Sequence, residues 1–202
     1  MALYAYHDTY KKLPPAVVRD NDGKPLYSWR VHVLPYLEQG PVYNKFNLNE
    51  PWDSPQNKAL LEPTPICFRT PWGWPGPDDP PGTTRYLAFT GPGTAFERAG
   101  LAWKDFPDGL AETMLVIESG SPVRWSEPAD LGYDPNGPLP PLGAGYTRAV
   151  RLFCYEVGRR RGMNAAFADG SVRFLRDPAD EATLRGIITR NGGEAVDRSK
   201  VE

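Results

Sequence analysis

Residues 163–175, MNAAFADGSVRFL, carry the pattern that decides the fold. Two strand-like runs flank the dipeptide Asp169-Gly170, which is a strong local signal for a tight β-hairpin. The spacing predicts a two-residue type I′ turn, with Phe167 opposite Val172 and a positive φ at Gly170. In that register one face is apolar, the other is mixed, and the arginine of the second strand points to solvent. The apolar face is expected to hold Met163, Ala165, Phe167, Val172 and Phe174, and the mixed face Asn164, Ala166, Ala168, Ser171, Arg173 and Leu175.

A helix with marked ends follows this hairpin. Asp177 is expected to cap it and Pro178 to occupy its first position. Its apolar stripe consists of Leu184, Ile187 and Ile188. Arg190 closes the helix before Asn191-Gly192-Gly193, so the C-terminal part is predicted to be a hairpin and a helix.

The N-terminal part predicts several short helices. Residues 1–12 read as the last turns of a helix, and Ser28 can cap a second helix that Pro35 kinks or restarts. Two further short helices are expected over residues 42–46 and after Ser54.

Apolar and β-branched runs predict the remaining strands. They cover residues 83–90, 112–119 and 150–157, with 123–125 continuing as a neighbour of the second run. Two loops rich in proline and glycine, residues 63–82 and 127–145, connect these elements. The pattern therefore indicates an α+β fold with an antiparallel sheet and long loops, in a single domain over residues 1–202.

Composition excludes several classes of protein. The chain has 202 residues and a formal net charge of −2, and 40% of its residues are hydrophobic, which is typical of a globular domain. Glycine (20) and proline (23) are too frequent for a mostly helical bundle. No apolar run approaches the roughly 20 residues of a spanning helix. The balanced charge gives no indication of a nucleic-acid partner, and no membrane contact is expected from the chain as given.

One basic run, Arg159-Arg160-Arg161, stands out from this balance. Such a run can meet phosphate or an acidic glycan, but a solvated loop is the favoured interpretation.

Residues able to carry chemistry are few. His7 and His32 are the only histidines, too few for a usual zinc site, and they are interpreted as structural. Cys67 and Cys154 can pair in an oxidising compartment, although free thiols are favoured. Neither a metal nor a cofactor is therefore predicted. The turn Asp20-Asn21-Asp22-Gly23 resembles the start of a calcium loop, but Lys24 and Val31 occupy later ligand positions.

Two functional alternatives remain open on these residues. Tryptophans on loops can stack on sugars, so Trp72, Trp74 and Trp125 are candidates for a glycan or small-solute site. A hydrolase would need Glu118 or Asp169 to meet His32 in one cleft.

Several segments together resemble the planctomycete proteins called domain of unknown function 1559, which are prepilin-like. The resemblance covers nearly the whole chain, and the order of the segments is the same. The segments are YHDTYKKLPPA (6–16), SWRVHVLPYLEQGPVYNKFNLNEPWDSPQNKALLE (28–62), YLAFTGPGTAF (86–96), DGLAETMLVIES (108–119), NAAFADGSVRFL (164–175) and ATLRGIITRNGGE (182–194).

The resemblance implies a pseudopilin-like plan, in which a hydrophobic helix precedes an α+β head. Residues 1–10 resemble the end of that helix, whose apolar part is absent here. The family's C-terminal signature is a histidine, nine residues, then Asp-Gly. Asp169-Gly170 matches it and Asn164 lies between, but Arg159 replaces the histidine, so no role of that histidine is carried over.

The resemblance implies a non-enzymatic structural or assembly protein with other protein subunits as partners and no catalytic residues. It also implies a place in the cell envelope or outside the cell, whereas a chain that truly starts at Met1 is expected to stay in the cytoplasm.

Overall fold

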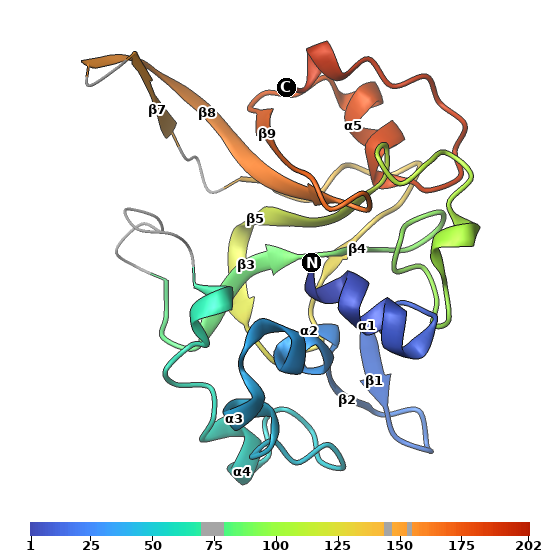
Figure 1. The fold of residues 1–202 in the computed structure, drawn as a ribbon, viewed down its shortest axis with the longest axis vertical. Helices are drawn as coiled ribbons and strands as arrows, with labels where there is room; N and C mark the ends of the chain where they lie inside the picture. The colour runs from blue at the N-terminus through green and yellow to red at the C-terminus, as the bar shows by residue number, and fades with distance from the viewer. Residues whose placement is uncertain (70–78, 144–146, 153–154) are drawn as a thin grey trace.

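A central antiparallel sheet organises the chain in the computed structural model, which describes residues 1–69, 79–143, 147–152 and 155–202 (Figure 1). Its strands follow the order β3-β5-β8-β7, and β9 pairs with β8 as well. Because the sheet is antiparallel and the helices are separate from it in sequence, the predicted α+β class is confirmed. The strands are β3 (Thr83–Leu87), β5 (Met114–Arg124), β7 (Thr147–Leu152), β8 (Tyr155–Phe167) and β9 (Val172–Arg176).

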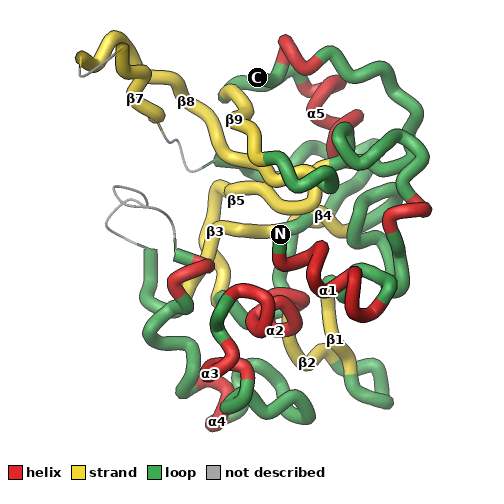
Figure 2. Tube along the Cα trace, viewed as in Figure 1, coloured by secondary structure: helices red, strands yellow, loops and turns green. Residues whose placement is uncertain are grey.

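The N-terminal part forms a layer of short helices and one hairpin on one side of this sheet (Figures 1 and 2). Ser28 caps α2 by accepting a hydrogen bond from the Arg30 N–H, and the chain tightens into a 3₁₀ turn, η1, where Pro35 enters. The elements are α1 (Ala2–Tyr10), β1 (Val17–Arg19), β2 (Pro25–Ser28), α2 (Trp29–Val33), η1 (Leu34–Leu37), α3 (Gly40–Tyr43), α4 (Pro55–Lys58) and η2 (Ile66–Phe68).

The remaining elements are short apart from the last α-helix. A parallel pair joins β4 to β6, with Phe89 opposite Leu131. The elements are β4 (Phe89–Thr90), η3 (Trp103–Asp105), β6 (Leu131–Gly132), α5 (Glu181–Ile188) and η4 (Arg198–Lys200). Among the residues that the structure describes, no helix combines the length and the apolar character that crossing a bilayer requires.

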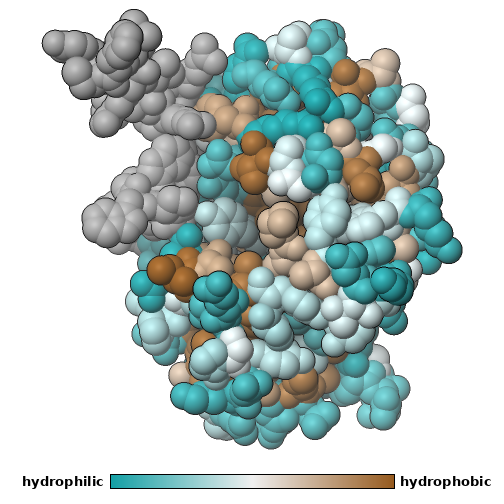
Figure 3. All heavy atoms as spheres, viewed as in Figure 1, coloured by the Kyte–Doolittle hydropathy of each residue, from teal (hydrophilic) through white to brown (hydrophobic). Residues whose placement is uncertain are grey.

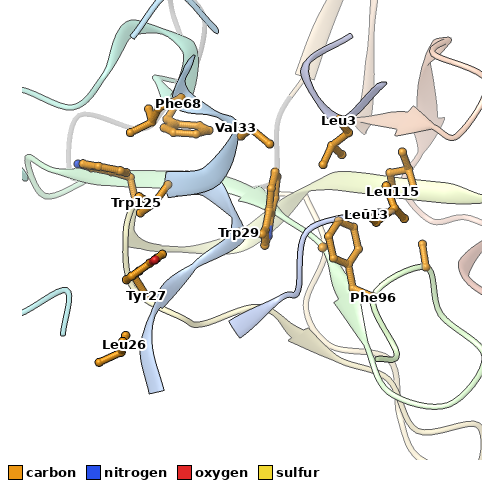
Figure 4. Packing of buried hydrophobic residues seen from close by; sticks show 14 of the residues in the cluster. Leu3, Leu13, Leu26, Tyr27, Trp29, Val33, Phe68, Phe96, Leu115 and Trp125 are labelled. Atoms are coloured by element: carbon orange, nitrogen blue, oxygen red, sulfur yellow. The ribbon is translucent and has the colours of Figure 1, made fainter. Parts of the chain in front are cut away.

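Apolar side chains cover both faces of the sheet. One cluster lies between the sheet and the N-terminal layer, and Figure 4 shows Trp29 in its middle with Phe96 and Leu13 on one side and Tyr27 on the other. The second cluster joins the opposite face to α5 through Leu184 and the two isoleucines of the predicted stripe. Burial of apolar surface on both sides is therefore what holds the short helices and α5 to the sheet.

The C-terminal hairpin forms, but its predicted register is wrong by one residue. Ala166, and not Phe167, lies opposite Val172, and the loop has three residues, 168–170. The Phe167 N–H donates to the Ser171 carbonyl at 2.9 Å, and Gly170 has the predicted positive φ, at 86°. This is the three-residue turn in which the last residue is left-handed, not the type I′ turn.

The changed register exchanges the faces of the second strand. Leu175 now faces Met163 and is fully buried, whereas Val172, expected in the core, is 67% exposed. Arg173 lies on the core side at the sheet edge, with its guanidinium carbon 4.1 Å from the centroid of the Phe167 ring. A slip of one residue moves every side chain of a strand to the opposite face, so the arginine expected in solvent covers an aromatic ring instead.

Three boundaries also differ from expectation. Asp180, and not Asp177, caps α5, because its carboxylate accepts the Thr183 N–H at 2.9 Å. The predicted strand over residues 150–157 is divided between β7 and β8, and residues 123–124 belong to β5 itself instead of forming a neighbouring strand.

A buried ion pair fastens the N-terminal layer to the loop that follows β5. Arg30 of α2 is fully buried, and its guanidinium donates to Asp130 at 2.8 Å. The same guanidinium donates to the carbonyl oxygens of Tyr86, Trp125, Glu127 and Ala129. Asp130 in turn accepts the Ala88 N–H at 2.9 Å, so one pair connects α2, the end of β3 and the loop between β5 and β6.

We predict that Gly170→Val lowers the free energy of unfolding by about 1–3 kcal/mol, because a β-branched residue is strained at φ 86°. Chemical denaturation measures this. Gly132→Val is the matched control, since Gly132 lies in an edge strand without a positive φ, and a Cβ added there would meet no atom within 4 Å. That control should change stability by about 0.5 kcal/mol or less. Equal effects of the two substitutions would contradict the turn geometry.

Arg30→Met should lower the free energy of unfolding by about 3–5 kcal/mol, because it leaves the Asp130 carboxylate buried without its cation. Arg30→Met with Asp130→Leu should recover part of this loss, and Arg19→Met, at an exposed position, should have little effect. Asp130→Leu alone completes the comparison. If the loss of unfolding free energy in the double variant equals the sum of the losses in the two single variants, Arg30 and Asp130 are not coupled, and the structural interpretation is wrong.

Candidate functional site

A groove of about 230 Å³ opens where α1 begins, between α2 and the tip of the β8–β9 hairpin. Apolar side chains dominate its wall, and the hairpin contributes Gly170 and the exposed Val172. Figure 3 shows tan and brown atoms gathered near the middle of this face of the molecule. The other apolar members of the wall are Met1, Ala2, Leu3, Val33, Leu37, Phe68, Leu115, Val116, Ala166 and Phe167.

The hairpin tip is fastened to α1, which fixes the shape of the groove. The Tyr4 hydroxyl donates a hydrogen bond to the Ala168 carbonyl. Burial and the nearby Asp169 carboxylate raise the pKa of Tyr4, which keeps the hydroxyl protonated as a donor. Residues far apart in the chain, from the start of α1 and from the Asp-Gly turn, therefore form one side of the groove.

The underside of α1 packs on η3. The Trp103 ring lies 4.8 Å from the Tyr4 ring and is stacked on His7 at the same centroid distance. The Trp103 backbone N–H donates to His7 Nε2 at 3.4 Å, and burial lowers the pKa of His7. His7 thus acts as a neutral packing and hydrogen-bonding group beneath the helix.

Cys67 lies in the groove wall as a free thiol. Burial raises its pKa to about 11, so the thiol stays protonated and is a poor nucleophile at neutral pH. Cys154 lies outside the described residues, as do Trp72 and Trp74 of the predicted glycan site.

Trp125, the third tryptophan of that site, lies in the core. It is fully buried, its ring is stacked 6.0 Å from the Phe68 ring, and its Nε1 donates to the Leu61 carbonyl at 3.2 Å. A stacking platform for sugars must be open to solvent, so Trp125 does not fit that role.

The structure does not bring the candidate acids together with His32. Glu118 is buried, and its carboxylate accepts hydrogen bonds from the backbone N–H and the side-chain amide of Asn164, at 2.7 and 3.1 Å. Asp169 accepts from the N–H and hydroxyl of Ser171 at the hairpin tip. Within the described part of the chain, neither acid is hydrogen-bonded to His32, so the arrangement needed for a hydrolase is not formed.

The motif residues of the C-terminal part have structural explanations. Asn164 links β8 to Glu118 of β5, and Asp169 and Gly170 form the turn. Arg159 occupies a position in β8 opposite Ala149 of β7. The groove could not be predicted from the sequence, because its wall comes from six separate segments and only their apolar character is visible before folding.

Metal binding has no support in the described ranges, where no group of three or more His, Cys, Asp or Glu side chains is placed to hold an ion. In the acidic turn before β2, the Asp20 carboxylate binds neighbouring backbone N–H groups. Asp20 Oδ1 accepts the N–H groups of Asp22 and Lys24 at 3.0 and 2.8 Å, which is the geometry of an Asx turn.

Comparison with known proteins identifies one family. Residues 1–140 match the family model described as a protein of unknown function (DUF1559). The matched range contains the N-terminal layer, β3 to β6 and the buried pair of Arg30 and Asp130, and it ends before the C-terminal hairpin. No curated protein and no solved structure matches the chain.

His32 is expected to make stability fall in mild acid. It lies between the Tyr6 and Tyr27 rings, at centroid distances of 5.8 and 5.6 Å, and burial lowers its pKa from the ordinary value of 6.5. The unfolded chain therefore binds the proton more tightly, and stability should be lost as pH falls through about 6.5. Urea unfolding of wild type and His32→Gln between about pH 7.5 and 5.5 measures this; an identical slope in both proteins would contradict the assignment.

Proposed function

This chain belongs to the DUF1559 family, and we propose that it is a pseudopilin-like structural protein of the cell envelope. Residues 1–202 act as one head domain. It works by contacting other protein subunits in an assembly and not by catalysis, and the groove at the start of α1 is the surface that makes this contact.

The exposed apolar surface around the groove carries this proposal. Val172 of β9 is 67% exposed and lines the groove. Large apolar side chains in contact with water raise the free energy of the isolated chain, and their clustering beside a groove marks an interaction site. Ile66, the residue before Cys67 of the groove wall, is also 73% exposed.

The surrounding structure supports a contact surface of fixed shape. The Tyr4 hydroxyl holds the hairpin tip on α1, and the inner wall belongs to the core cluster through Leu3 and Leu115. A surface that is formed before binding loses little conformational entropy when a partner docks, which favours association.

The state of the candidate chemical groups argues against catalysis as the main activity. Glu118 and Asp169 are engaged in holding strands and a turn, and the Cys67 thiol is held protonated. A catalytic acid needs a free path to its substrate and a nucleophilic thiol must be deprotonated, whereas these two acids hold backbone and side-chain donors and this thiol stays protonated.

A photo-crosslinking amino acid at position 172 tests the proposal in the native host. We expect crosslinks to another protein subunit from position 172, because the side chain borders the groove, and none from position 22, which is exposed on the turn between β1 and β2. Val172→Asp should reduce recovery of the same complex without lowering the melting temperature, since an exposed position tolerates a charge. Equal crosslinking from both positions, or full recovery with Val172→Asp, would contradict the proposed surface.

A further inference from the structure

A second hollow, which we call the Trp52 pocket, lies beside α4, and Figure 1 shows α4 at the end of the molecule opposite to α5. Its volume is about 520 Å³, within the range of small-molecule sites. Three segments form its wall: the residues just before α4, the end of α4 with the turn that follows, and the end of β5. None of its described lining residues lines the groove beside α1. They are Trp52, Asp53, Lys58, Ala59, Leu61, Glu62 and Arg124.

A buried asparagine fixes the segment that carries the tryptophan. Asn57 of α4 is fully buried, its Oδ1 accepts the Asn47 N–H at 2.8 Å, and its amide donates to the Pro51 carbonyl at 3.0 Å. The Trp52 N–H in turn donates to the Leu26 carbonyl of β2 at 2.7 Å. This wall of the pocket is therefore formed before a ligand arrives, so a ligand that binds there costs little conformational entropy of the protein.

Trp52 gives the pocket an aromatic surface that is held in place. Its side chain is half-buried and packs against the core cluster that contains Tyr27 and Phe46, while it also lines the pocket. Unlike the fully buried Trp125, it can present part of its ring to a ligand. A sugar ring has a face of C–H groups, and packing that face on an aromatic ring removes apolar surface from water.

Four charged side chains share the wall with this aromatic surface, and their formal charges cancel. Asp53 and Glu62 can accept hydrogen bonds, whereas Lys58 and Arg124 can donate them. The Arg124 guanidinium is held in position because it donates to the Pro81 carbonyl. Sugar hydroxyls both donate and accept, so a wall that combines carboxylates with cations offers partners for both functions.

We propose that the Trp52 pocket binds a neutral saccharide, stacked on the tryptophan with its hydroxyls on the charged side chains. The two carboxylates repel the phosphates of a nucleotide and the carboxylate of an acidic sugar. A lipid chain would bring the four charged groups against apolar surface, which is costly. The proposal moves the glycan site expected from the sequence from Trp125 to a tryptophan that lines a hollow.

Saturation-transfer NMR of the full chain with maltose, cellobiose, lactose and N,N′-diacetylchitobiose tests this site. We expect transfer to at least one of these disaccharides, strongest at the ring C–H protons that face the tryptophan. Sialyllactose, which adds an acidic sugar to lactose, should not bind more tightly than lactose. Trp52→Leu keeps an apolar side chain on the core and should weaken binding about tenfold. Trp103→Leu, at a half-buried position outside the pocket, should change the affinity by about twofold or less.

A second pair of variants tests the polar side chains. Asp53→Asn with Glu62→Gln should weaken binding about fivefold or more, because an amide oxygen is a weaker acceptor than a carboxylate. Asp8→Asn with Asp22→Asn removes the same charge at exposed positions outside the pocket and should change the affinity by about twofold or less.

Thermal melting checks the folding of each variant, and the Asp53 and Glu62 pair decides alone if Trp52→Leu unfolds the chain. The proposal would be overturned by no transfer to any of the four neutral disaccharides, or by tighter binding of sialyllactose than of lactose. Binding that a folded pocket variant leaves unchanged, or that its control weakens equally, would overturn it too. Crosslinking from position 172 probes a different set of residues, so the two proposals can fail separately.

Discussion

The buried pair of Arg30 and Asp130 is the constraint on which the arrangement of this fold depends. A guanidinium that is fully removed from water must find partners for all its donors, and Arg30 finds them in one carboxylate and four backbone carbonyls. Those partners belong to β3 and to the chain that leaves β5. The position of α2 on the sheet is therefore set by hydrogen bonds of defined direction, while the apolar contacts around Trp29 supply burial without direction.

This constraint links the family match to the groove. The matched residues, 1–140, include both members of the pair, and α2 also supplies Val33 to the wall of the groove. A displacement of α2 would therefore also displace the groove wall and the surface on which α1 packs. The helix α2 therefore contributes to both features. Arg30 forms the buried pair in the interior of the fold, and Val33 lines the groove that is proposed as the contact surface.

The two ends of β8 have different partners. Its last residues lie between β5 and β9, are buried under α5, and lead into the turn that Tyr4 holds. Its first residues, Tyr155 to Arg161, pair with β7.

The amino-acid sequence by itself indicated most of the helices and the strands β3, β5 and β9, because caps, prolines, glycines and apolar spacing act over a few neighbouring residues. It did not indicate the short strands β1, β2 and β6. It located the α2 cap at Ser28, the positive φ at Gly170 and the apolar stripe of α5. Tertiary structure alone decided the hairpin register, since burial of Leu175 under α5 and exposure of Val172 depend on elements that the hairpin pattern does not contain. It also decided that Arg30 and Trp125 are interior groups and that an apolar groove opens beside α1, because each of these depends on contacts between residues far apart in the chain.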